Sequence, residues 1–272
     1  FMKPQSLAQG DSVIILSPSG RVEEERIKKS AEILTNWGLK VRFSNHAFSS
    51  HFKLAGTDEE RLSDLQEALD DKEIKAIFCA RGGYGLVRII DQLDFSKFKK
   101  NPKWVVGFSD VTVLHNELNK LGIASLHAPM PNSYDSTPEF AMNSLYRALF
   151  DAQYHFDSAF SDEEIVGGNL TIMYSLLGTN SDLNTDNKVL LIEDIGEYAY
   201  NIDRMMHALN KAGKLKKLKG LLVGQFTNIN EDGFGYTVLE IIENCTKNYN
   251  FPIYFNIPVG HVSDNRAVIL GK

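Results

Sequence analysis

In the first half of the chain, short apolar runs alternate with stretches whose apolar residues recur at helical spacing. The apolar runs predict strands at residues 12–16, 39–43, 74–80, 104–108 and 123–126. The helical spacing predicts helices at residues 26–37, 58–69, 86–93 and 111–121. Strands that alternate with helices form a parallel, doubly wound sheet, whose site lies at the carboxyl ends of the strands. We therefore expect an α/β domain over residues 1–150.

After Phe150 the regular alternation fades, and residues 151–161 are aromatic and polar without a clear period. Gly167-Gly168-Asn169 has the composition of a turn, so we expect a linker or crossover at residues 151–168. Beyond it, the pattern predicts helices at 169–177 and from Asn201 to near Gly213, and strands at 188–192, 220–225, 251–257 and 267–270. These elements predict a second domain over residues 169–272.

Only Ser109 and Asp110 separate the strand predicted at 104–108 from the helix that follows it. A serine on so sharp a strand-to-helix turn is lifted out of the sheet, beside the backbone N–H groups of a helix start, as in a nucleophile elbow. Gly107 matches the first glycine of Gly-x-Ser-x-Gly, whereas Val111 stands at the second glycine position. The alternative is that Ser109 or Asp110 only caps the helix.

A glycine-rich loop, with Gly82, Gly83 and Gly85, follows the strand predicted at 74–80 and lies at the same edge of the sheet as Ser109. Glycines let the backbone approach a ligand closely, and its N–H groups can bind negative charge. The loop lacks the Walker lysine and the Gly-x-Gly-x-x-Gly order, so it does not indicate a nucleotide site. An oxyanion hole is its natural use if Ser109 attacks a carbonyl.

A nucleophilic serine needs a base, and the chain has seven histidines. His115 is too far along the predicted helix to reach back to Ser109. His127 ends a neighbouring strand and could line the pocket, whereas His261 lies in a loop after a buried strand, where catalytic groups tend to lie. Spacing alone does not choose between His127 and His261.

The acid that would orient the base is also left open by spacing. Glu193 and Asp194 end a strongly apolar predicted strand, and the alternation of side chains puts them on opposite faces of it. Glu197 follows shortly after and competes with both.

Composition and charge exclude several classes of protein. The 43% hydrophobic and 24% charged fractions are those of an ordinary globular protein. A formal charge of −6 argues against sequence-independent nucleic-acid binding, which needs a basic surface. Cys79 and Cys245 are the only cysteines, so the sequence indicates no disulfide framework and favours a reducing compartment.

No stretch is long enough for a membrane span, and the start shows no basic-then-apolar signal, so we expect a cytoplasmic protein without membrane contact. The sequence contains no metal-ligand spacing such as His-Glu-x-x-His, and we expect neither a metal nor a cofactor. It does not fix the oligomeric state and is compatible with a homodimer.

Four stretches together resemble the LD-carboxypeptidase family of serine peptidases, which also contains the microcin C self-immunity peptidases. They are Ala-Arg-Gly-Gly-Tyr-Gly at 80–85, Gly-Phe-Ser-Asp-Val-Thr at 107–112, Leu-Ile-Glu-Asp at 191–194 with Glu197, and Gly260-His261 with Asp264-Asn265. They appear in the family's order and span most of the chain.

The resemblance implies a Ser109–Glu193–His261 triad and an oxyanion hole formed by the backbone N–H groups of Gly83 and Asp110. It implies an α/β N-terminal domain with the serine and a smaller, β-rich C-terminal domain with the other two triad residues. It also implies a murein peptide as substrate, cut at the amide between an L-configured centre and a terminal D-alanine.

An exopeptidase must also recognise the terminal carboxylate, and Arg81, next to Gly82 in the glycine loop, is the candidate for that contact. Two alternatives stay open. A microcin-type peptidase would hydrolyse an aminoacyl-nucleotide analogue and would need a base-stacking aromatic residue in a pocket loop. A non-catalytic α/β module would instead use the glycine loop to bind an anion.

Overall fold

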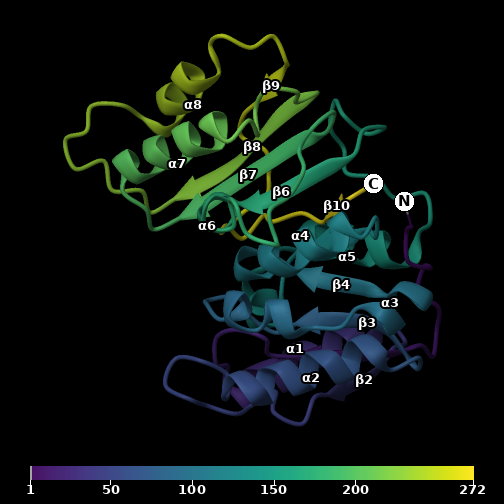
Figure 1. Cartoon of the computed structure of the whole chain (residues 1–272). Helices are drawn as coiled ribbons and strands as arrows, with labels where there is room; N and C mark the ends of the chain where they lie inside the picture. Colours follow the sequence, from purple (N-terminus) through teal and green to yellow (C-terminus); the bar gives the residue numbers. More distant parts are fainter. Residues whose placement is uncertain (1) are drawn as a thin grey trace.

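The computed structural model describes residues 2–272, which form two β-sheets flanked by helices (Figure 1). The larger sheet contains β1 (Ser12–Leu16), β2 (Lys40–Phe43), β3 (Ile74–Cys79), β4 (Trp104–Gly107), β5 (Ser125–His127) and β10 (Val268–Leu270). Its order is β10-β5-β4-β3-β1-β2, and every pair is parallel except β10 with β5. The strands predicted in the first half are therefore present, with small differences at their ends.

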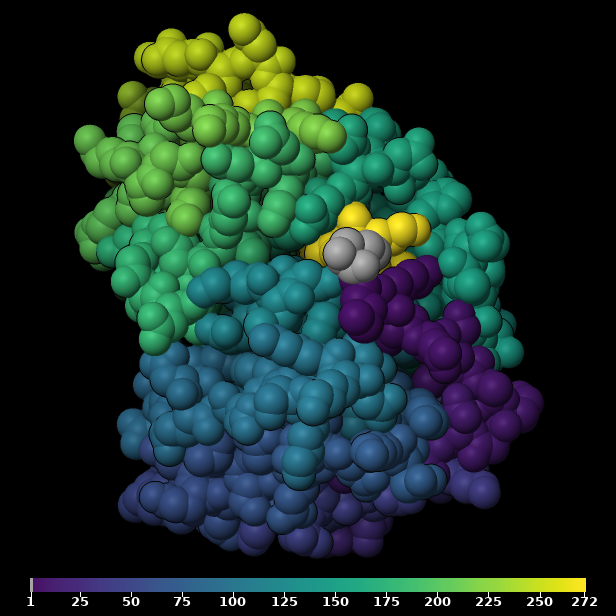
Figure 2. Space-filling model, turned by 45° about the vertical axis from the view of Figure 1, so that its right-hand side comes forward, coloured from purple at the N-terminus to yellow at the C-terminus, as the bar shows by residue number. Residues whose placement is uncertain are grey.

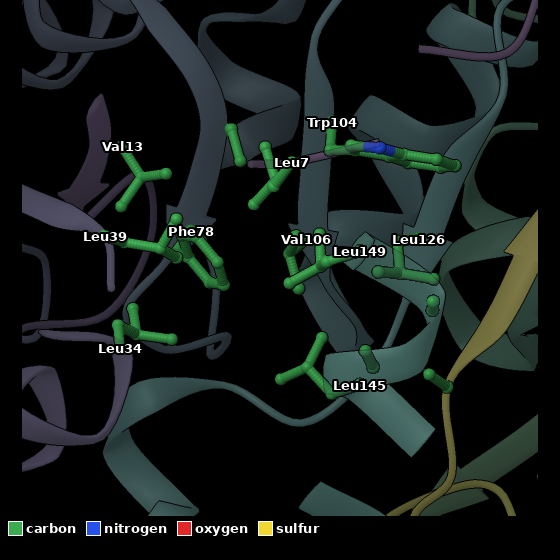
Figure 3. Packing of buried hydrophobic residues seen from close by; sticks show 14 of the residues in the cluster. Leu7, Val13, Leu34, Leu39, Phe78, Trp104, Val106, Leu126, Leu145 and Leu149 are labelled. Atoms are coloured by element: carbon green, nitrogen blue, oxygen red, sulfur yellow. The ribbon is translucent and has the colours of Figure 1, made fainter. Parts of the chain in front are cut away.

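Helices cover both faces of this sheet. They are α1 (Glu24–Asn36) and α5 (Glu139–Phe150) on one face, and α2 (Asp58–Asp70), α3 (Ser96–Lys100) and α4 (Thr112–Lys120) on the other. On the first face, Leu34 of α1 and Leu145 of α5 pack against Phe78 and Val106 of the sheet (Figure 3). Helices on both faces of a largely parallel sheet make this part doubly wound, as the sequence predicts.

Two elements of the first half differ from the prediction. Residues 86–93 form two short 3₁₀ turns, η1 (Leu86–Arg88) and η2 (Ile90–Gln92), rather than one helix. Ile89, with φ −120°, separates the turns, although Leu86, Ile89 and Ile90 are all buried. The helical spacing therefore identified the buried residues correctly, but two short 3₁₀ turns bury them in place of a continuous helix. A further turn, η4 (Pro131–Ser136), and the helix α5 were not predicted.

The second sheet is smaller and entirely parallel, in the order β6-β7-β8-β9. Its strands are β6 (Ile165–Asn169), β7 (Val189–Ile195), β8 (Gly220–Thr227) and β9 (Ile253–Tyr254). The helices α6 (Leu170–Ser175), α7 (Ala199–Lys211) and α8 (Val238–Thr246) pack on one face. Val268 and Leu270 of β10, with Phe156 and Phe160, cover the other face.

Two predictions in this half are wrong in detail, and one helix was not predicted. Gly167-Gly168-Asn169 is the end of β6 rather than a turn, because its backbone pairs with β7. The helix α7 begins at Ala199 with Tyr198 as its N-cap, so Asn201 lies inside it. The helix α8 was not predicted, although Thr237 and Glu240 form a capping box that the sequence displays.

The last strand joins the two sheets. β10 pairs with β5 of the larger sheet, while Gly271 N–H donates to the carbonyl of Ile165 in β6. Figure 2 shows the last residues, in bright yellow, at the surface between the two parts of the molecule and next to the purple N-terminal segment. None of the helices within residues 2–272 has the length and apolar character needed to cross a membrane.

Candidate active site

Ser109 lies where β4 ends and α4 is about to begin, at the first position of a 3₁₀ turn, η3 (Ser109–Val111). Its φ is +64°, a left-handed conformation that is uncommon for a residue other than glycine. This strain at the turn is the feature expected of a nucleophile elbow. The helix-cap alternative is not what the structure shows, because the Ser109 side chain hydrogen-bonds to His261.

Ser109, His261 and Glu193 form a hydrogen-bonded chain. The Ser109 Oγ lies 3.1 Å from His261 Nε2, and His261 Nδ1 lies 2.7 Å from Glu193 Oε2. A carboxylate can only accept hydrogen bonds, so Nδ1 carries the imidazole proton and donates to Glu193. Nε2 is then free to accept from the serine hydroxyl. The imidazole is partly exposed, at 19%, whereas the Glu193 side chain is fully buried.

Glu193 reaches this position because it comes near the end of β7, on the face of the second sheet that turns toward the His261 loop. Gly260, next to His261, has φ +134°, and a Cβ there would lie 3.2 Å from the Cβ of Glu193. The glycine therefore allows the loop to approach the carboxylate closely. Asn265 closes the loop, since its Oδ1 accepts from the Gly260 N–H at 3.0 Å.

The neighbouring acids point elsewhere. Asp194 accepts hydrogen bonds from the hydroxyl and the N–H of Thr171 in α6, on the opposite face of β7. Burial raises the pKa of its carboxyl. Glu197 accepts from Thr171 and Asn201. Of the three acids that compete in the sequence, only Glu193 bonds to His261.

The glycine loop lies directly against Ser109. A Cβ on Gly82 would come within 3.0 Å of the Ser109 Cβ and 3.2 Å of its Oγ. The Gly82 carbonyl accepts from the Gly20 N–H at 2.9 Å, which fixes the loop to the turn after β1. Asp110 is in the first turn of its helix, where N–H groups lack an intrahelical acceptor. The backbone at Gly83 and Asp110 is thus available at the edge of the serine site.

The Asp110 side chain stabilises the loops around the serine turn. It is buried, and its Oδ2 accepts from Ser19 Oγ at 2.5 Å and from the Leu86 N–H at 3.0 Å. Burial raises the pKa of this carboxyl. Through these contacts Asp110 holds the turn after β1 and the glycine loop against the serine turn.

A cavity of about 570 Å³ opens over this cluster. Ser109, His261, Phe108 and the loop residues Arg81, Gly82 and Gly83 are among its lining residues. Arg81 is exposed, and its Nη1 donates to the carbonyl of Arg21 at 2.9 Å. The guanidinium therefore lies at the rim of the cavity, toward the turn after β1.

His127 does not line this cavity. Its side chain is fully buried, because β5 lies inside the sheet between β4 and β10. Neither of its ring nitrogens has a hydrogen-bond partner among residues 2–272. Burial holds its pKa well below the usual value, so the imidazole is neutral. The prediction that His127 lines the pocket, where it would contact substrate, is corrected accordingly: His127 packs beneath Phe108, which in turn packs against His261.

Asn169 is a site residue that the sequence did not single out. Its amide Nδ2 donates to Glu193 Oε1 and to Asp194 Oδ1, each at 3.2 Å, while its Oδ1 caps α6. The only signal was an asparagine ahead of a predicted helix, which indicated the cap and not the contact with Glu193. Within residues 2–272 no group of three or more His, Cys, Asp or Glu side chains could hold a metal ion.

Models of known families match most of the chain. The LD-carboxypeptidase N-terminal domain matches residues 13–128, and the LD-carboxypeptidase C-terminal domain matches residues 163–272. The chain therefore belongs to the LD-carboxypeptidase family and is a serine-type carboxypeptidase, not a non-catalytic binding module.

Individual relatives agree with this assignment. A probable murein peptide carboxypeptidase of Bacillus subtilis (strain 168) is 33% identical over 287 residues, which cover 99% of this chain and 89% of the relative. The crystal structure of muramoyltetrapeptide carboxypeptidase from Oxalobacter formigenes has a TM-score of 0.85 at 28% identity and covers 96% of this chain and 92% of that one. The microcin C7 self-immunity protein MccF, in complex with aspartyl sulfamoyl adenosine, has a TM-score of 0.88 at 20% identity. It covers 98% of this chain and 93% of its own, and at that identity it shares the fold alone.

Proposed function

We propose that this carboxypeptidase hydrolyses the amide bond before a terminal D-alanine in murein tetrapeptides, with Ser109 as nucleophile, His261 as base and Glu193 as the acid that orients it. The observation that carries the proposal is the hydrogen-bonded chain of 3.1 Å and 2.7 Å that joins these three side chains beside an open cavity. The murein peptide carboxypeptidases among the relatives support the substrate class. Such substrates arise in cell-wall recycling, so we propose a cytoplasmic role.

The reaction follows the logic of a serine, histidine and acid triad. The Ser109 oxygen attacks the carbonyl carbon while His261 Nε2 takes the hydroxyl proton. The tetrahedral intermediate then collapses, the amide C–N bond breaks, and His261 returns the proton to the leaving nitrogen of D-alanine. Water next attacks the acyl-enzyme with the same histidine as base, which releases the shortened peptide and restores the serine.

Two further groups complete the proposal. The N–H groups of Gly83 and Asp110 would stabilise the negative oxygen of the intermediate, as oxyanion-hole donors do. Gly82 supports this role because a larger residue would contact Ser109. Arg81, at the rim of the same cavity, would bind the terminal carboxylate of the substrate.

Cleavage of an aminoacyl-nucleotide analogue, as in microcin immunity, is the alternative activity. It would require an aromatic side chain free to stack on a base. Among the described residues that line the serine cavity, Phe108 is the only Phe, Tyr or Trp, and its ring packs against His127 and His261. Among these lining residues no ring is therefore free to stack on a base, and the exposed Phe52 and Tyr84 line a neighbouring cavity.

The test combines labelling with turnover. A fluorophosphonate probe should label the wild-type protein and fail to label Ser109→Ala. The wild type should release D-alanine from a murein tetrapeptide and leave a processed microcin analogue intact. Labelling that persists in Ser109→Ala would overturn the nucleophile assignment, and preferential cleavage of the microcin analogue would overturn the substrate.

A further inference from the structure

A second and larger cavity, of about 1050 Å³, adjoins the serine cavity. Arg81 and Gly83 line both, so the two cavities meet at the glycine loop. The residues that line the larger cavity all lie between Gly20 and Arg88, in the segments that follow β1, β2 and β3 and at the start of α2. The steps of the proposed reaction take place in the serine cavity and place no part of the substrate in the larger one.

The wall of this cavity is held by backbone bonds. The Arg21 N–H donates to the Lys53 carbonyl at 3.0 Å, and the Arg21 carbonyl accepts from the Arg81 guanidinium at 2.9 Å. Gly20 forms an isolated antiparallel β-bridge with Leu54, and its N–H donates to the carbonyl of Gly82. Three cationic residues from three separate loops are thus fixed next to one another.

Those three cations lack acidic partners. The ion pairs of the cavity wall join Arg88 and Arg61 to Asp58, which leaves Arg21, Lys53 and Arg81 outside any ion pair of the described residues. The chain as a whole carries a formal charge of −6, so this cluster is not part of a general basicity. Clustered cations without acidic partners favour an anionic ligand.

Aromatic residues rim the same cavity. Phe52 is 85% exposed and Tyr84 is 54% exposed. Exposed large aromatic side chains next to unpaired cations suit a peptide that presents both apolar stems and carboxylates.

The proposed reaction determines which part of a peptide would lie here. His261 must reach the leaving nitrogen, so the nitrogen of D-alanine faces His261 within the serine cavity, which Arg81 also lines. The carbonyl oxygen of the acyl residue points at Gly83, where the two cavities meet. The scissile carbonyl then lies where the two cavities meet, and the larger cavity, of about 1050 Å³, has the room that the acyl part of a peptide needs.

We propose that the larger cavity binds the acyl part of the substrate, the peptide segment that precedes the scissile amide, and that Arg21 and Lys53 recognise its carboxylates. This inference rests on the proposed function. It assigns the ligand as an acidic peptide segment and makes Arg81 the boundary between the two cavities.

The experiment compares two substrates that share the same scissile bond. One is the murein tetrapeptide, and the other is an N-acetylated two-residue peptide that ends in D-alanine and lacks the upstream carboxylates. Lys53→Met and Arg21→Gln keep the backbone bonds of the wall. Lys247→Met, at the exposed end of α8, is the matched control.

Each cavity variant should lower kcat/KM for the tetrapeptide by about tenfold, mainly through KM, which is the loss expected for one charge-assisted hydrogen bond. The short substrate should change by less than about twofold, and Lys247→Met should affect neither. Added salt should raise the tetrapeptide KM in the wild type more than in Lys53→Met. Equal losses on both substrates, or none on either, would overturn the inference.

Binding separates this inference from the proposed function. The tripeptide product, which ends in the new carboxylate, can be titrated calorimetrically into Ser109→Ala and into Ser109→Ala with Lys53→Met. Weaker binding in the second protein supports the subsite even if the wild type hydrolyses neither peptide, an outcome that would refute the proposed function alone. Undiminished binding would reject the subsite.

Discussion

Replacing Glu193 with glutamine would remove a charge while keeping the shape of a fully buried side chain. The wild-type Oε2 is 2.7 Å from His261 Nδ1, and Oε1 accepts from Asn169. In the proposed mechanism His261 gains a proton as Ser109 attacks, and a neutral amide cannot compensate the positive charge. Leaving a partly buried charge without its partner costs about 3–5 kcal/mol. Applied to the transition state, that cost lowers kcat by about 10²- to 10⁴-fold.

The assay is the steady-state release of D-alanine from a murein tetrapeptide, with kcat and KM measured separately. Glu193→Gln should lower kcat and leave KM within about threefold, because the carboxylate does not face the peptide. Its thermal unfolding midpoint should stay close to that of the wild type, since a glutamine carbonyl can still accept from Asn169.

Glu197→Gln is the matched control, since Glu197 accepts from Thr171 and Asn201 and does not bond to His261. It should retain kcat within about threefold of the wild type. A silent Glu193→Gln together with an inactive Glu197→Gln would refute the reasoning and move the acid to the later position.

Three further outcomes follow. Ser109→Ala and His261→Ala should each lower turnover by about 10⁴-fold or more, and the double variant little further, because the residues act as a unit; additive losses in kcat would contradict this. Arg81→Ala should lower kcat/KM about tenfold on the free acid and much less on a C-terminally amidated peptide, and equal losses on both would remove Arg81 from carboxylate recognition. Burial lowers the pKa of His115 from its ordinary value of 6.5 to about 4, so its stabilising contribution is present above pH 6.5 and is lost as the pH falls toward 4. Urea unfolding at both pH values should show the wild type losing about 3 kcal/mol more than His115→Gln, and parallel losses would contradict that assignment.

The inner strands β1, β3 and β4 were predictable because most of their residues are buried, so each reads as a nearly continuous apolar run, whereas the edge strand β2 is exposed or half-buried along its length. The place of Ser109 was predictable for a related reason, since parallel strands bring their carboxyl ends to one edge. The helix α2 also shows its start in the sequence, where Thr57 and Glu60 form a capping box.

The choice between His127 and His261 could not be made from spacing, because a tertiary contact decides it. The pairing of β10 with β5 encloses His127 inside the sheet, and the residues of β10 lie more than a hundred positions away in the chain. The same limit applies to Gly167 and Gly168, whose positive φ values of 112° and 138° resemble a turn locally. Their pairing with β7 makes them a strand, and Asn169 at its end then reaches Glu193.

The proposed triad draws on both sheets, so its geometry depends on how firmly they are joined. Ser109 follows β4 of the larger sheet, whereas Glu193 lies near the end of β7 in the smaller sheet. The His261 loop lies between β9 of the smaller sheet and β10, which pairs with β5 beside β4. The histidine is therefore tethered at one end to the sheet that carries the acid and at the other to the sheet that carries the serine. Because β10 also packs its Val268 and Leu270 against the smaller sheet, the two sheets share one apolar layer. The distance between Ser109 and His261 is consequently set by strand pairing and packing, and a hinge between the sheets would have to break both to separate the two side chains.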